Sequence, residues 1–126
     1  MTETGTGRHP LVTVLGLLRA DAPGDIERAP QAWPRWAVLL PHVLAATSHL
    51  PTVPGQSTPG GDDASWLLDA AAAYLQVHAR LTEARPLQER ALAITEAAYG
   101  PDHPAVAVIR GNLSRMVREA DAAKGD

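Results

Sequence analysis

Histidines are the side chains of this sequence most able to do chemistry, and there are five of them. His42 and His49 stand on one side of a predicted helix, whereas His78 and His103 stand alone. Metal sites on helices usually contain His-x-x-x-His or Glu-x-x-His, and neither spacing occurs. We therefore expect surface or capping histidines and no metal, with His103 helping a helix to begin before Pro104.

A hydrolytic triad is the second possibility that the residue types allow, because Ser65 and His78 could be combined with a nearby aspartate. A catalytic serine of this kind usually occupies a sharp strand-to-helix turn beside backbone amides that stabilise an oxyanion. No such turn surrounds Ser65. The chain has no cysteine, so thiolate nucleophiles and thiolate zinc sites are excluded. We expect no enzyme activity and no cofactor.

Composition and charge exclude several further classes of function. A net charge of -3 gives no basic footprint for nucleic acid or for an anionic membrane. The 126 residues suit one domain, and 45% hydrophobic residues are ordinary for a globular protein. No leader peptide is evident, and no apolar run reaches the roughly 18 residues of a spanning helix. We expect a cytoplasmic protein, and the excess of arginine over lysine suggests a bacterial source.

The first half of the chain predicts helices. Phenylalanine is absent and alanine is abundant, which favours helices over strands. Residues 10–19 have helical spacing, although their valines leave a strand open. A second helix is expected at residues 34–48, either kinked or restarted at Pro41. We expect a disordered start at residues 1–9 and N-terminal helices within residues 10–50 that pack on the rest.

The second half predicts a linker and three helices. Residues 51–61 are rich in Pro, Gly, Ser and Thr, and are expected to form a flexible linker. Helix-forming residues then occupy 62–122, before a tail at 123–126. The carboxylate of Asp62 or Asp63 is expected to cap the third helix, which ends near residue 79, and Thr82 to cap the fourth. The fifth helix has one apolar and one polar side, which is typical of a terminal helix.

Three short blocks follow one another in this second half. They read TEARPLQERALAI at residues 82–94, YGPDHP at residues 99–104 and GNL at residues 111–113. The series closely resembles the tetratricopeptide repeats of kinesin light chain and its bacterial relatives, over about half the chain. The resemblance implies a stack of antiparallel helix pairs that binds other proteins. Ala72 and Ser114, both small and central in their helices, lie 42 residues apart, within the range of periods found in repeat arrays.

The resemblance also assigns structural roles within the repeat. The residues that pack between helices or form turns are Ala72, Ala84, Leu87, Ala91, Gly100, Pro101, Pro104 and Leu113. Ala79, Gln88 and Arg110 replace the usual glycine, aromatic and leucine. We therefore expect a degenerate array of one and a half repeats, whereas such units need about three neighbours. The N-terminal helices supply those neighbours, or the protein dimerises, or the chain is part of a longer protein.

The segment at residues 33–45 resembles the helical stretch that precedes such repeats in bacterial signalling ATPases of the NB-ARC type. The phosphate-binding pattern Gly-x-x-x-x-Gly-Lys-Ser/Thr does not occur, so ATP hydrolysis is not carried over. Trp33, Trp36 and Leu40 are expected to anchor the N-terminal helices onto the repeat.

Positions that face the concave groove in the family carry a mixed set of side chains here. Repeat register places Trp66, Asp69 and Gln76 on the third helix, and Arg115 and Arg118 on the fifth. Tryptophan and arginine are enriched at binding hot spots, and arginine suits carboxylates. The resemblance thus implies a groove for a peptide or helix with an acidic end. Alternatively, Trp66 packs under the linker or the second helix, and the arginines form a solvated face.

The expected fold class is all-α, with antiparallel helix pairs forming a fragment of a tetratricopeptide-like α-solenoid behind N-terminal capping helices. The expected function is a non-catalytic scaffold or adaptor module that binds another protein or peptide. Two alternatives stay open. One is a self-associating structural domain, a homodimer that completes the short array, and the other is a small-ligand-binding helical domain.

Overall fold

The structure is a computed structural model that describes residues 10–24, 26, 28–48, 50 and 60–125. Five α-helices lie within these ranges, together with one 3-10 turn at Pro30–Ala32. The helices are α1 (Pro10–Asp21), α2 (Trp33–Ser48), α3 (Gly61–Val77), α4 (Leu81–Tyr99) and α5 (Pro104–Gly125). No strand occurs in the described residues, and the expected all-α class is confirmed. The predicted disordered start at 1–9 and residues 51–59 of the predicted linker lie outside the description.

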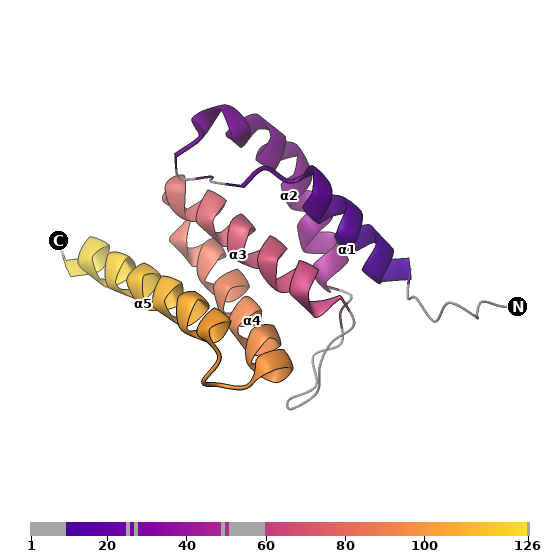
Figure 1. Cartoon of the computed structure of the whole chain (residues 1–126). Helices are drawn as coiled ribbons and strands as arrows, with labels where there is room; N and C mark the ends of the chain where they lie inside the picture. The colour runs from indigo at the N-terminus through magenta and orange to yellow at the C-terminus, as the bar shows by residue number, and fades with distance from the viewer. Residues whose placement is uncertain (1–9, 25, 27, 49, 51–59, 126) are drawn as a thin grey trace, which may run out of the picture.

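The antiparallel pair of α3 and α4 forms the centre of the molecule, with α1 and α2 on one side and α5 on the other (Figure 1). Ala72 on α3 and both Ala84 and Ala91 on α4 have no solvent exposure. Side chains this small let two helix backbones approach closely, and a larger side chain at the contact would have no outlet. Leu87 on α4 is half-buried against the same core, and Leu113 on α5 is half-buried.

The turn between α3 and α4 has the hydrogen bonds of a Schellman motif. The Arg80 amide donates to the Leu75 carbonyl at 2.8 Å, and the Ala79 amide donates to the Gln76 carbonyl at 2.9 Å. Ala79 therefore adopts the left-handed conformation, with φ of 61°. This is the position at which the resemblance leads one to expect glycine, and an alanine Cβ is strained there.

α1 and α2 dock onto α3 through two tryptophans. Trp36 is fully buried, stacks near Tyr74 with ring centroids 6.3 Å apart, and donates its indole N–H to the Pro23 carbonyl. The indole N–H of Trp33 donates to the Ile26 carbonyl at 2.9 Å. Each tryptophan thus buries a large apolar ring while satisfying its one donor. Trp36 thus contacts α3, Trp33 lies edge-on to His78 at the end of α3 with ring centroids 4.8 Å apart, and Leu40 lies in the same buried cluster as Trp36.

Two open questions of the first half are resolved by the backbone. Residues 10–21 are helical, so the strand alternative is wrong. α2 runs without interruption through Pro41, so the helix does not restart there. The proline ring is exposed.

The predicted side-chain caps are wrong. Gly60 caps α3 with φ of 72° and no side chain contributes a bond, whereas Asp62 and Asp63 lie in the first turn. A Cβ on Gly60 would lie 3.1 Å from the Leu15 side chain, so close packing against α1 also favours glycine. Arg80 is the N-cap residue of α4, because the helix begins directly after the Schellman turn. Thr82 therefore lies inside the first turn.

Replacing Ala79 by glycine should stabilise the protein. Relief of the left-handed strain exceeds the entropy that glycine adds to the unfolded chain, so we expect a gain of about 0.5–1 kcal/mol in the free energy of unfolding. Urea unfolding followed by circular dichroism measures it. Ala93→Gly, at an exposed helical site in α4, is the matched control and should lose about 1 kcal/mol. A loss at both positions would contradict the analysis.

Candidate interaction groove

A groove follows α3, and residues of α1, α4 and α5 also line parts of it. Four neighbouring hollows compose it, and adjacent hollows share lining residues: Asp62 and Tyr99, then Trp66 and Asp69, then Gln76 and Arg115. The central hollow has a volume of about 260 Å³. We call this series of hollows, from Asp62 to Glu119, the α3 groove.

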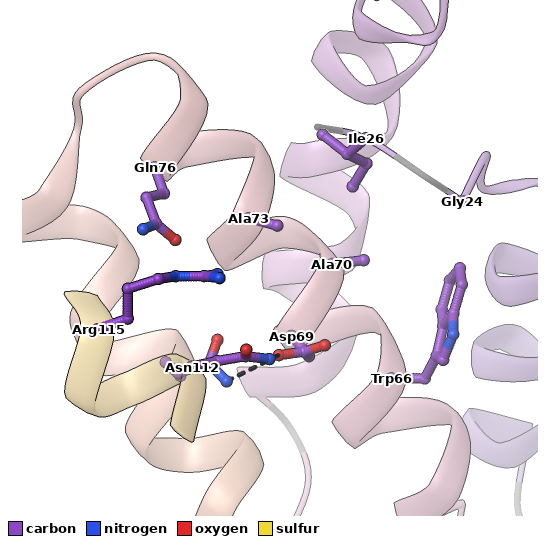
Figure 2. Close-up of a pocket in the computed structure, with 10 residues that line it drawn as sticks. Gly24, Ile26, Trp66, Asp69, Ala70, Ala73, Gln76, Asn112 and Arg115 are labelled. Atoms are coloured by element: carbon purple, nitrogen blue, oxygen red, sulfur yellow. Dashed lines mark hydrogen bonds between the residues drawn. The ribbon is translucent and has the colours of Figure 1, made fainter. Parts of the chain in front are cut away.

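A carboxylate held by two amides forms the middle of the groove. Asp69 Oδ1 accepts hydrogen bonds from Gln88 Nε2 at 2.7 Å and from Asn112 Nδ2 at 3.2 Å (Figure 2). Gln88 is 1% exposed, and its amide also lies 3.4 Å from the Ile109 carbonyl. A buried amide needs such partners. Asp69 therefore faces the groove in an orientation that the core of the repeat fixes.

Trp66 is half-buried and lines two of the hollows. The Arg19 guanidinium of α1 lies 5.1 Å from the centroid of the indole ring, and its Nη1 donates to Asp63 Oδ1 at 3.0 Å. A cation over an aromatic face is attracted by the ring quadrupole. Arg19 of α1 therefore covers part of Trp66, and the tryptophan still borders the groove.

Gln76 and Arg115 border the far end of the groove. Gln76 Nε2 donates to Glu119 Oε1 at 2.6 Å, which joins α3 to α5. Arg115 extends from α5 toward Gln76 (Figure 2). Arg118 is exposed and lines none of the four hollows. The structure thus brings together Trp66, Asp69, Gln76 and Arg115 of the predicted set, and leaves Arg118 outside.

A tyrosine forms a hydrogen bond at the end of the groove that lies beside the start of α3. Tyr99 Oη donates to Asp62 Oδ1 at 2.5 Å, and its ring stacks on His103 with centroids 4.4 Å apart. The hydrogen bond to Asp62 and, to a smaller extent, burial raise the pKa of Tyr99 above its usual value. His103 Nδ1 accepts the Ala105 amide at 3.0 Å, so the expected role of His103 at the start of α5 is confirmed.

Sequence reasoning missed Arg19, Gln88, Asn112 and Tyr99 as groove residues. For Gln88 a signal existed, because a polar residue at a position expected to be buried must find a polar partner. Arg19 gave no signal, since its contact with Asp63 joins residues 44 positions apart.

The residues considered for metal binding or for catalysis do not form such a site in the described part of the chain. His42 is exposed on α2, His49 lies outside the description, and His78 packs edge-on between Trp33 and Tyr74. Ser65 Oγ donates to the Asp62 carbonyl, so Ser65 and His78 do not form the triad drawn from the sequence. In the described ranges, no cluster of three possible metal ligands occurs. None of the helices described is both long and apolar enough to cross a membrane.

Short antiparallel helix pairs joined by tight turns, with a groove along the first helix of the pair, define a helical-repeat interaction domain. The sequence profile of the tetratricopeptide repeat matches residues 60–124, which is more than half of the chain. The chain belongs to the tetratricopeptide-repeat family. Members of this family generally mediate protein–protein interactions and are typically non-catalytic. No curated protein and no solved structure matches the chain significantly.

The Tyr99–Asp62 bond predicts a pH dependence. Because the folded-state pKa of Tyr99 is raised, its contribution to stability is complete below the unfolded pKa of about 10 and is lost as the pH rises through the higher folded value. Urea unfolding above pH ~9 should show a decline in stability that Tyr99→Phe reduces. Tyr74→Phe is the control that keeps the bond. An equal decline in the wild type and in Tyr99→Phe would contradict the assignment.

Proposed function

We propose that this chain is a non-catalytic adaptor domain that binds an extended segment of another protein along the α3 groove. The observation that supports this most directly is the series of hollows along one helix. Trp66, Asp69, Gln76 and Arg115 border hollows that share lining residues along α3. An aromatic anchor between polar groups is the usual composition of a peptide-binding surface.

The dimensions favour a peptide over a small molecule. From Asp62 to Gln76 the groove follows α3 for about 21 Å, at about 1.5 Å per residue. An extended chain advances about 3.3 Å per residue, so about six residues of a partner fit. The single hollows have volumes of about 260 to 550 Å³, which overlap the range of about 300–1,000 Å³ of small-ligand sites, so it is the length of the groove that favours a peptide.

The proposal extends to the subtype and context of the repeat. A kinesin-light-chain-like bacterial type is supported by the turn at residues 99–104, where Gly100 adopts φ of 87° and His103 bonds to the start of α5. The likeness of residues 33–45 to the region before such repeats supports a role beside signalling ATPases of the NB-ARC type. A cytoplasmic location stays a prediction from the sequence.

Trp66→Ala should weaken peptide capture. Selection of a random-peptide display library on the immobilised chain yields ligands whose affinity is then measured for variants. Removing the aromatic anchor should weaken groove ligands by about tenfold or more. Val38→Ala, on the exposed side of α2, is the control and should change nothing. Ligands that bind a folded Trp66→Ala chain as tightly as the wild type would place the binding surface elsewhere.

Self-association is the second candidate, and exposed apolar side chains favour it. Val14 is 44% exposed, Leu17 67% and Val38 55%. α1 and α2 contact each other, and an ion pair joins Asp21 at the end of α1 to Arg35 near the start of α2. Leu17 and Val38 are thus exposed on neighbouring helices. A second copy covering this side would lengthen the short helical array.

If this candidate is correct, the wild type should form a dimer in sedimentation equilibrium, and Leu17→Glu should convert it to a monomer. A charge at the centre of an apolar contact costs several kcal/mol when it has no partner. Ser114→Glu, exposed on α5 on the opposite side of the α3–α4 pair, adds the same charge as the control. A monomer at high concentration for the wild type would exclude self-association.

A further inference from the structure

The charges that line the α3 groove are unequal. Among the described lining residues, the carboxylates are Asp62, Asp63, Asp69 and Glu119, and the guanidinium groups are Arg19 and Arg115. We propose that the groove selects a basic segment, which places an arginine or lysine side chain between Trp66 and Asp69. This inference rests on the proposed function and adds the chemistry of its partner.

Three of the carboxylates accept hydrogen bonds from neutral donors. Asp62 accepts from the Tyr99 hydroxyl, Asp69 from two side-chain amides, and Glu119 from the Gln76 amide. Neutral donors orient a carboxylate and leave its negative charge in place. Each carboxylate has about four acceptor positions, so these bonds do not fill it. The groove therefore presents preoriented negative groups along its length, which attract a cationic side chain.

Arg19 shows how this surface holds a guanidinium. Its charged group lies over the Trp66 ring and pairs with Asp63, so an aromatic face and an adjacent carboxylate act together. Asp69 lies one helical turn further along α3 and borders the same two hollows as Trp66. A partner's cation at Asp69 would repeat this arrangement, using the part of the tryptophan surface that borders the groove.

The two arginines of the groove do not cancel its net negative charge. Arg19 is paired with Asp63 at 3.0 Å. Arg115 lies four residues before Glu119 on α5, a spacing at which opposite charges are neighbours on a helix, so these two charges offset each other and the charges of Asp62 and Asp69 remain. The proposal departs from the acidic partner expected from the sequence, because Arg118 lines none of the hollows and Asp69 occupies the centre of the groove.

The test uses three peptides, Gly-Ser-Leu-Xaa-Leu-Xaa-Leu-Ser-Gly with arginine, glutamine or glutamate at Xaa. Binding to the full chain is measured by titration of the Trp66 indole N–H signal in NMR spectra, with the buried Trp36 indole as the internal reference. The arginine peptide should bind about tenfold more tightly than the glutamate peptide. Raising NaCl from about 50 to about 500 mM should reduce this difference.

Two substitutions give effects of opposite sign. Asp69→Asn keeps an acceptor oxygen for its amide partners and should weaken the arginine peptide by about tenfold. Arg19→Gln removes a competing cation and should strengthen it. Asp121→Asn makes the same charge change on an exposed side chain outside the groove, and should have no effect. If Asp69→Asn fails to fold, Asp62→Asn takes its place.

The outcomes separate the two claims. Tighter binding of the glutamate peptide, or stronger binding after Asp69→Asn, overturns the basic-segment proposal and leaves groove binding intact. If none of the peptides moves the Trp66 signal of the folded chain while display ligands do, the charge proposal also fails. If display ligands bind but ignore Trp66→Ala, the proposed function itself fails.

Discussion

The close approach of α3 and α4 is the constraint on which the other features of the structure depend. Ala72, Ala84 and Ala91 are fully buried at this contact, and protein interiors packed this tightly tolerate little added volume. The separation of the two helices in turn sets whether Gln88 on α4 can reach Asp69 on α3, which it does at 2.7 Å. A wider contact would break that hydrogen bond and release the carboxylate at the centre of the groove.

Gln88 joins the core of the repeat to its outer surface. The resemblance leads one to expect an aromatic residue here, which would contribute apolar burial and no hydrogen bond. The glutamine instead bonds to Asp69 and lies near the Ile109 carbonyl, so one side chain connects α3, α4 and α5. An unsatisfied buried amide would cost about 1–3 kcal/mol. Because losing these bonds would leave the Gln88 amide unsatisfied, they favour a single arrangement of the groove.

Helix positions were predictable because they rest on local periodicity, whereas caps and groove partners were not. The end of α4 at Gly100 followed from residue type, and so did the start of α5 at Pro104. The cap of α3 depended on how closely Gly60 approaches Leu15 of α1, a tertiary distance that no local pattern encodes. Repeat register placed Trp66 and Asp69 on one side of α3, but the contact of Arg19 with Trp66 required knowledge of how α1 docks. Arg110, at the usual leucine position, is exposed and pairs with Glu96.

The helices on the two sides of the α3–α4 pair differ, and this asymmetry determines how the groove differs from one built of repeats alone. α5 is amphipathic and turns exposed polar residues such as Arg118 and Asp121 outward. On the other side, α1 and α2 cover α3 through Trp36 and Tyr74. Because α1 also sends Arg19 over Trp66, a helix outside the repeat borders the binding surface. The selectivity of the groove is therefore a property of the N-terminal helices and the repeat together, and a repeat excised without α1 would present a different surface.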